Sequence, residues 1–405
     1  MGKRWVSGSA EARLTSRRTS SGLDTRTMAA LRSPRTAGVL NGIATTRATQ
    51  VSSTRSAREI FHENPSIFFY SAPAGARSQE SLELAALSAV EGLVHTRVDL
   101  PAPPKRRGQA RWKRVLGLAS TAVVLWAVWF WPARRNYYSK RAEVRYRLDV
   151  PYVVGSSNPK QQLDLYLPLA ATAGFPIVVF VHGGYWSALD RRWLEPLLGT
   201  HGNVGVALAR RGIAAAVIGY RQYPEVRSGD DSLDDIASAI RFVRGSCPAW
   251  GCGPLFVVGH SAGGHLVSLL ALDGRILHRN AIESNAVAGF VSIDGIFDLR
   301  AAIPAFTPEQ ASILRGLFGP DDLALALHSS FSYARREHPR LLFLDSANDE
   351  RVCRDGFRAL EARMKELGSP AEFIELPGLG HNEAIVRIGM DEDPVLPRLL
   401  SFIRH

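Results

Sequence analysis

Short apolar runs alternate with segments of helical spacing along residues 148–405, and this alternation constrains the fold more than any other feature of the chain. The runs are typical of strands, most of them buried on both faces, and occupy residues 161–168, 175–184, 213–221, 254–261, 287–294, 340–349 and 371–378. Helical spacing predicts helices at 231–245, 262–272, 354–367 and 394–404. Strands alternating with helices predict an α/β fold with a mostly parallel central sheet and helices on both faces.

Residues suited to chemistry stand where several of these strands end. His182-Gly183-Gly184 ends one strand, Ser261 a second and Asp349 a third, and His381 follows the last strand. Ligands of open α/β sheets bind beyond the carboxyl ends of the strands. We therefore expect the functional site at this edge of the sheet.

Residues 259–263, Gly-His-Ser-Ala-Gly, match the G-x-S-x-G pattern between a predicted strand and a predicted helix. A sharp strand-to-helix turn at this pattern exposes the serine hydroxyl above the sheet, and the flanking glycines leave room for neighbouring backbone. The pattern is short, but its strand and helix context favours Ser261 as a nucleophile over a glycine-rich turn.

A serine hydroxyl needs a base within hydrogen-bond reach, and this kind of turn is followed in the chain by an acid and then a histidine. Two histidines follow Asp349, and one of them is the terminal His405, so His381 is the expected base. Asp345, Asp349 and Glu350 are candidate acids, and we prefer Asp349 because it follows its strand.

An oxyanion formed at Ser261 needs N–H donors. Ala262 lies next to the serine at a helix N-terminus, and the backbone of Gly184 and of Gly183 or Tyr185 is expected to supply a second and a third donor.

The segments VHGGYW, YRQYP, VVGHSAGGHL, SANDERV and GLGH together resemble the α/β-hydrolase superfamily in its H-G-G esterase and lipase branch. The resemblance covers residues 150–405. Within that branch, the chain is similar both to prenylcysteine methylesterase-like carboxylesterases and to kynurenine formamidases. It implies an α/β-hydrolase fold, no metal and no organic cofactor. It also implies a catalytic triad made of Ser261, Asp349 and His381. The oxyanion hole that it implies is made of Gly183, Gly184 and Ala262.

The resemblance has one departure: many relatives carry His-Gly where this chain has Asp345-Ser346. The histidines at 260 and 265, which flank the nucleophile turn, are usually structural in the family. Residues 295–339 predict a small cap, whose apolar residues would form a substrate pocket with Tyr185 and Trp186.

The net charge of +11 comes entirely from residues 1–114, a leader rich in Ser, Thr and Arg that has no apolar periodicity. We expect this leader to be largely disordered, as a transit-like segment or a solvated tail. Because residues 115–405 carry equal numbers of basic and acidic groups, we expect no nucleic-acid partner.

Residues 115–131 contain no charged side chain, and basic clusters flank the run on both sides. As a helix, this run is about 26 Å long, close to the thickness of a bilayer's hydrocarbon core. We expect a single-pass transmembrane helix over 115–132 that anchors the chain in a lipid bilayer. The flanking charges leave its orientation open.

The three cysteines form no zinc pattern, since C-x4-C occurs once. Cys247 and Cys252 are either a local disulfide in an oxidising compartment or two thiols. The resulting expectation is a membrane-anchored serine carboxylesterase acting on a small-molecule ester. A formamidase-type amidase and a catalytically silent binding module with the same fold are the alternatives.

Overall fold

The structure is a computed structural model that describes residues 120, 131–170, 172–193, 195, 198–283 and 285–405. The predicted leader, residues 1–114, lies outside the described residues. So does the predicted membrane span, except for Ser120, Trp131 and Pro132. Among the described residues, no helix has both the length and the apolar character that crossing a membrane requires.

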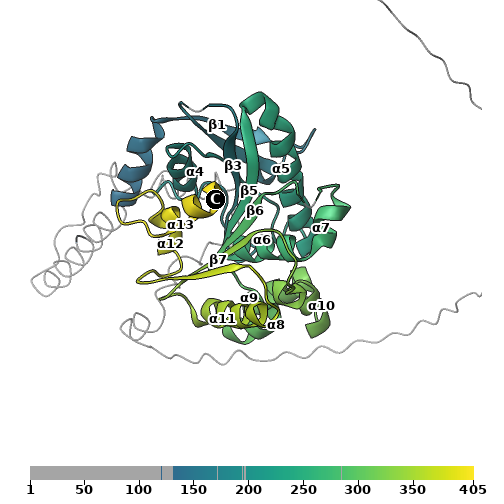
Figure 1. The fold of residues 1–405 in the computed structure, drawn as a ribbon. Coiled ribbons are helices and arrows are strands. Elements are labelled where there is room, and N and C mark those ends of the chain that lie inside the picture. Colours follow the sequence, from purple (N-terminus) through teal and green to yellow (C-terminus); the bar gives the residue numbers. More distant parts are fainter. Residues whose placement is uncertain (1–119, 121–130, 171, 194, 196–197, 284) are drawn as a thin grey trace, which may run out of the picture. The chain divides into compact units, whose positions relative to one another are not determined.

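Eight strands form one sheet in the order β1-β2-β4-β3-β5-β6-β7-β8 (Figure 1). Strands β1 and β2 pair antiparallel, β2 pairs antiparallel with β4, and all other neighbours are parallel. The strands are β1 (Val144–Pro151), β2 (Gln162–Pro168), β3 (Phe175–Val181), β4 (Ala214–Ile218), β5 (Cys252–His260), β6 (Gly289–Ile293), β7 (Leu341–Ser346) and β8 (Glu372–Leu376). The predicted mostly parallel α/β sheet is confirmed.

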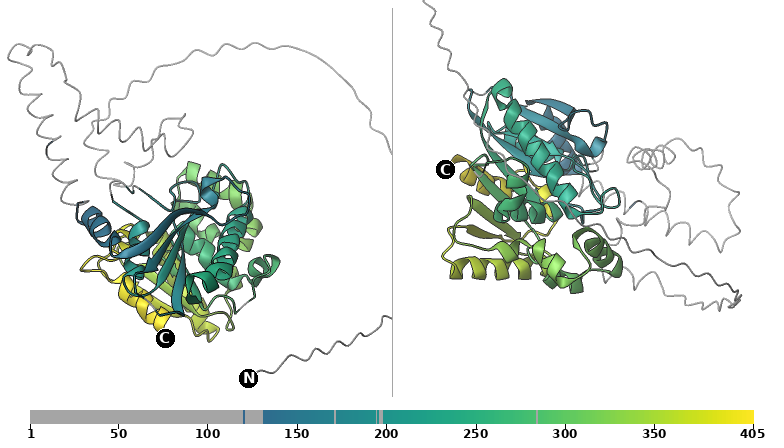
Figure 2. Two further views of the ribbon diagram at one scale, coloured as in Figure 1. Left: turned by 90° about the horizontal axis from the view of Figure 1, so that it is seen from above. Right: turned by 90° about the vertical axis from the view of Figure 1, so that its right-hand side faces the viewer.

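Helices cover both faces of the sheet, as predicted (Figure 2). Side chains alternate along β3, so that Ile177 and Val179 belong to one apolar core while Val178 and Phe180 belong to the other. The first core includes α5 (Gly229–Trp250), α6 (Ala262–Leu272), α7 (Gly274–Arg279) and α11 (Arg351–Glu366). The second includes α4 (Gly202–Ala209), α12 (Glu383–Val386) and α13 (Val395–Arg404).

Several elements differ from the sequence expectation, among them the unpredicted helices α4, α7 and α12. Strand β1 was not predicted, because it is an edge strand in which most side chains are exposed and no apolar run exists. Helix α5 was predicted to end at Gly245, but it continues to Trp250 and ends at Gly251, whose φ is +82°. Gly245 has open space around it, so its backbone stays helical without a cap.

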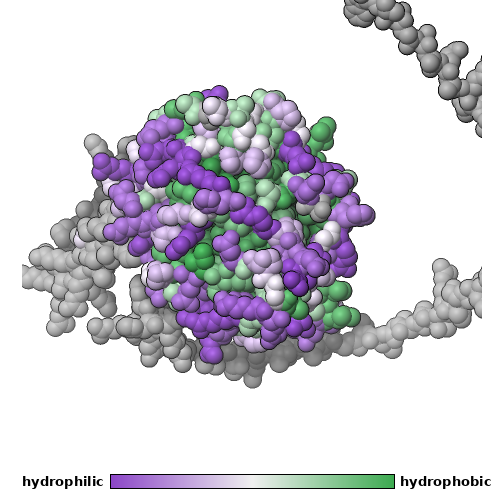
Figure 3. Space-filling view, in the orientation of Figure 1, coloured by the Kyte–Doolittle hydropathy of each residue, from purple (hydrophilic) through white to green (hydrophobic). Residues whose placement is uncertain are grey.

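The segment predicted as a cap consists of short helices between β6 and β7. They are α8 (Leu299–Ala302), η3 (Ile303–Ala305), α9 (Pro308–Phe318), α10 (Asp322–Leu327) and η4 (Ser330–Tyr333). Helix α8 contacts both α10 and α11, and these helices lie together at one end of the domain in Figure 1. On the face drawn in Figure 3, hydrophilic residues surround apolar surface near the middle.

The Cys247–Cys252 disulfide, one of the two alternatives left open by the sequence, is formed in the structure. It joins the last turn of α5 to the first residue of β5. Cys353 is a buried free thiol in α11.

A helix over residues 131–141 packs against the domain through Tyr137. The Tyr137 side chain is 1% exposed, and its hydroxyl donates to Glu195 Oε1 at 3.0 Å. Gly199 and Gly202 make room for the ring, since a Cβ on either residue would lie 2.2 Å or 2.8 Å from it. The segment that directly follows the predicted membrane span is therefore part of the domain's packing.

We expect Tyr137→Ala to lower the free energy of unfolding by about 3–4 kcal/mol, because it removes a buried aromatic ring and leaves a cavity. Urea denaturation monitored by intrinsic fluorescence measures this loss. Tyr138→Ala is the matched control and should cost about 1 kcal/mol, since Tyr138 is 38% exposed and donates one hydrogen bond. Equal losses for the two variants would contradict the packing role of Tyr137.

Candidate active site

Ser261 occupies a strained turn between β5 and α6. Its φ is +56° and its ψ is −121°, a conformation that costs free energy for a residue with a Cβ. Its N–H donates to the carbonyl oxygen of Ile293 at 2.9 Å. A Cβ on Gly259 would lie 2.3 Å from the carbonyl oxygen of Gly263, so the glycines of the pattern are required by close backbone contact.

The side chains of three predicted residues form a hydrogen-bonded row, with His381 between Ser261 and Asp349. Ser261 Oγ lies 2.8 Å from His381 Nε2. His381 Nδ1 lies 2.9 Å from both carboxylate oxygens of Asp349. These three residues come from the β5–α6 turn, the loop after β8 and the loop after β7, so the parallel sheet brings them to one edge.

The other two candidate acids have different surroundings. Asp345 is 1% exposed within β7, and its Oδ1 has no hydrogen-bond partner among the described residues. Glu350 lies at the start of α11, where its Oε1 accepts a 3.4 Å hydrogen bond from the Tyr185 hydroxyl. Asp349 is therefore the candidate acid that bonds to His381.

The surroundings of His381 favour its protonated form. Burial alone would lower its pKa, but the hydrogen bond and the charge of Asp349 outweigh burial, and Asp294 and Glu350 add to them. Together they raise the pKa of His381 to about 9. The imidazole is thus a strong base, suited to accepting the proton of a hydroxyl.

His260 and His265 contact backbone carbonyls near the nucleophile turn. His260 Nε2 lies 3.0 Å from the carbonyl oxygen of His381, and the two rings lie 4.8 Å apart. His265 Nε2 lies 2.7 Å from the carbonyl oxygen of His328. Burial lowers the pKa of both imidazoles, to about 4 for His265, so both are neutral donors that hold loops in place.

The predicted oxyanion residues lie around Ser261. A Cβ on Gly183 would be 2.9 Å from the Cβ of Ser261, so the backbone of the loop after β3 lies directly against the serine. Three consecutive residues of this loop have positive φ, namely Gly184, Tyr185 and Trp186. Positive φ costs free energy in residues that have a side chain, so the loop is strained at Tyr185 and Trp186. Ala262 begins α6, where the first N–H groups have no acceptor within the helix.

The two predicted pocket residues differ in burial. Trp186 is 2% exposed, and its Nε1 donates to His265 Nδ1 at 3.1 Å, so the structure places it in the core beneath the loop rather than on a pocket wall. Tyr185 lies at the surface of the same loop, with its ring 6.1 Å from that of Phe306.

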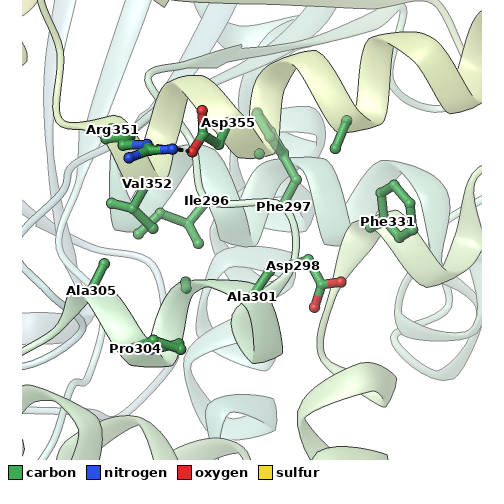
Figure 4. Close-up of a pocket in the computed structure, with 13 residues that line it drawn as sticks. Ile296, Phe297, Asp298, Ala301, Pro304, Ala305, Phe331, Arg351, Val352 and Asp355 are labelled. Atoms are coloured by element: carbon green, nitrogen blue, oxygen red, sulfur yellow. Dashed lines mark hydrogen bonds and ion pairs between the residues drawn. The ribbon is translucent and has the colours of Figure 1, made fainter.

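A groove of about 480 Å³ lies between α11 and the segment that contains α8 and η3 (Figure 4). Its lining is mostly apolar and includes Ile296, Ala301, Pro304, Ala305 and Val352. The lining includes Ala305 and Arg351, which are the chain neighbours of Phe306 and Glu350, the two residues that contact Tyr185. None of the three triad residues lines the groove.

His, Cys and Asp ligand atoms within 4.8 Å of one another form three groups among the described residues, and all three include His381 or Asp349. One group, with Cys353, contains both His381 and Asp349, and a metal ion there would compete with their hydrogen bond. We therefore assign His381 and Asp349 to the Ser–His–Asp array.

Asp294 is the residue at this edge that sequence reasoning missed. It is fully buried directly after β6, next to the strand that carries Ser261. Its place at the carboxyl end of a predicted strand was a usable signal, but it belongs to no motif.

The chain is similar to known esterase-like proteins. The BD-FAE family matches residues 163–364. A probable isoprenylcysteine alpha-carbonyl methylesterase of Arabidopsis thaliana is 25% identical over 268 residues, which are 60% of this chain and 54% of that protein. A kynurenine formamidase of Danio rerio is 27% identical over 40% of this chain and 50% of its own length. The chain thus spans about half the length of these relatives.

Solved structures share the fold at low identity. Esterase B from Lactobacillus rhamnosis superposes with a TM-score of 0.55 at 20% identity, over 74% of this chain and 95% of its own. A carbohydrate esterase from gut microbiota gives 0.54 at 20% identity, over 64% and 95%. The structures share the α/β-hydrolase fold, and together with the family match and the relatives they support an α/β-hydrolase, esterase-like family for this chain.

Proposed function

We propose that this protein is a serine hydrolase that cleaves carboxylic esters. The observation that carries the proposal is the position of His381, which bonds Ser261 through Nε2 and Asp349 through Nδ1. Relatives named as methylesterases and neighbours named as esterases support the same reaction class.

The arrangement suits a two-step acyl transfer. Ser261 Oγ attacks the ester carbonyl carbon while His381 Nε2 takes the hydroxyl proton. The tetrahedral intermediate collapses, the C–O bond to the alcohol breaks, and His381 returns the proton to the leaving oxygen. Water then attacks the acyl-serine by the same route, which releases the acid and restores Ser261.

The intermediate's negative oxygen would be bound by the N–H groups of Ala262, Gly183 and Gly184. The backbone of Gly183 lies against Ser261, and Ala262 directly follows Ser261. The positive φ angles of Tyr185 and Trp186 in the same loop are a structural cost that such a role accounts for. Each donor of this kind typically contributes on the order of 3 kcal/mol to transition-state stabilisation.

A formamidase-type amidase is the second candidate, and the match to kynurenine formamidases favours it. The same triad can attack a formamide carbonyl, so the two reactions need the same residues. A catalytically silent binding module has less support, because all three triad residues are present at bonding distance.

The proposal includes a membrane anchor at residues 115–131, with the lipid bilayer as a partner. Its support is the sequence: an uncharged run with basic clusters on both sides. Flotation of the chain with liposomes, compared with a chain that starts at residue 132, tests it. Equal flotation of both would overturn this part of the proposal.

The proposed substrate is an ester with an apolar chain that lies in the groove between α8–η3 and α11. The support is the groove's mostly apolar lining and the presence in it of Ala305 and Arg351. These two residues are chain neighbours of Phe306 and Glu350, which contact Tyr185 in the loop that follows Gly184. An apolar chain buried there gains about 0.8 kcal/mol per CH2.

Ser261→Ala should lower hydrolysis of p-nitrophenyl acetate by about 10⁶-fold, because it removes the nucleophile. It should also abolish labelling by a fluorophosphonate probe. Ser268→Ala is the matched control, since Ser268 is a buried serine on α6 whose hydroxyl donates to the carbonyl of His265. Persistent activity in Ser261→Ala would reject the mechanism, and faster cleavage of N-formylkynurenine than of esters would favour the amidase.

The rate of fluorophosphonate labelling should rise with pH through a midpoint near 9. The sign follows from the raised pKa of His381, since only the neutral imidazole accepts the serine proton and that form predominates above the pKa. Labelling of Ser261→Ala gives the background at each pH. A midpoint near 6.5, the ordinary histidine value, would contradict the expected charge environment.

Ala301→Trp should lower kcat/KM for p-nitrophenyl octanoate about 10- to 100-fold and leave the acetate ester within twofold. The indole would fill the groove, and only the longer chain would lose burial there. Leu323→Trp, on the exposed surface of α10 and outside the groove, is the control. Equal effects on both esters would place the acyl chain elsewhere.

A further inference from the structure

Asp294 is a buried carboxylate that the proposed mechanism does not use. It follows β6 with a φ of +50° and has no exposed surface. Ser346 in β7 donates twice to it, through its N–H at 2.7 Å and its hydroxyl at 2.9 Å. Burial raises the pKa of Asp294 to about 7, and the charge of Asp349 acts in the same direction. The charge of His381 and the two Ser346 donors oppose this shift and favour the ionised carboxylate.

Asp294 also lies close to the imidazole of His381. Ligand atoms of Asp294, His260 and His381 all lie within 4.8 Å of one another, and His260 Nε2 is 3.9 Å from Asp294 Oδ2. At such distances in a buried site, a carboxylate interacts strongly with an imidazolium.

The charged and titratable groups that face His381 come from four elements. Asp349 and Glu350 lie in the loop after β7, and Cys353 lies on α11. His260 lies at the end of β5, and Asp294 follows β6. Burial lowers the pKa of His260, and burial raises that of the Cys353 thiol, so the negative charge around His381 comes from the carboxylates.

We propose that Asp294 is a positioning residue, a second carboxylate that shares with Asp349 the stabilisation of the protonated His381. This inference rests on the proposed serine-hydrolase function. No proton passes to Asp294 and no bond changes there; its charge acts on the imidazolium that forms when Ser261 attacks. The acid function is therefore divided between the ends of two neighbouring strands, β6 and β7.

The test is a double-mutant cycle of Asp349→Ala and Asp294→Asn, read as kcat/KM for p-nitrophenyl acetate. The double variant should fall about 10⁴-fold below the wild type, as expected for a triad without its acid. Asp349→Ala alone should keep 10- to 100-fold more activity than the double variant, because Asp294 remains. Equal activity of the two would overturn the inference.

The pH profile separates an electrostatic role from a structural one. Asp294→Asn should shift to lower pH the rise in kcat/KM that follows deprotonation of His381. The reason is that removing a nearby negative charge lowers the pKa of the imidazole. Asp345→Asn is the matched control: Asp345 lies within 4.8 Å of Asp294 and Asp349, but not in the group with His381. Equal shifts in both variants, or none in Asp294→Asn, would overturn the inference.

Ser346→Ala provides a second route if Asp294→Asn does not fold. It removes one donor to Asp294 and should lower the activity of the Asp349→Ala variant a further 3- to 10-fold; no change would count against the inference. Fluorophosphonate labelling of the wild type is measured in parallel. Absence of that labelling would reject the proposed function itself, whereas labelling together with equal activity of Asp349→Ala and the double variant would reject only the role of Asp294.

Discussion

The close contact of backbone with backbone between the ends of β3 and β5 holds the rest of the site in place. A Cβ on Gly263 would lie 2.3 Å from the carbonyl oxygen of Val181, and one on Gly183 would lie 2.9 Å from the Cβ of Ser261. The strained serine turn and the loop after β3 therefore fit only against each other. The same contact that fixes the nucleophile also brings the proposed oxyanion donors to it, so the two features are one packing constraint.

Burial of several ionisable groups beside this contact needs local compensation, because an isolated buried charge is costly. Asp349 accepts from His381 and from the N–H of Glu350. Asp294 accepts from Ser346. Asp345 keeps an oxygen without a partner among the described residues, and burial raises its pKa to about 7. Burial likewise raises the pKa of Asp294 to about 7, although His381 and the Ser346 donors act in the opposite direction.

The sequence predicts the parts of this structure that depend on residues close together in the chain. Apolar runs locate the buried strands, and the parallel topology then explains why Ser261, Asp349 and His381 meet at one edge. Strand β1 escapes prediction because its edge position exposes most of its side chains. Asp294 escapes because its partner Ser346 is 52 residues away, and only the pairing of β6 with β7 brings them together.

Position 346 is important for this pairing, because the Ser346 hydroxyl is one of the two donors to Asp294. A glycine at 346 would keep the N–H donor and lose the hydroxyl, which would leave a buried carboxylate less satisfied and less ionised. The roles of Ser346 and Asp294 are thus linked. The Ser346 hydroxyl donates a hydrogen bond to the buried carboxylate, and in the proposed mechanism the negative charge of that carboxylate stabilises the His381 imidazolium.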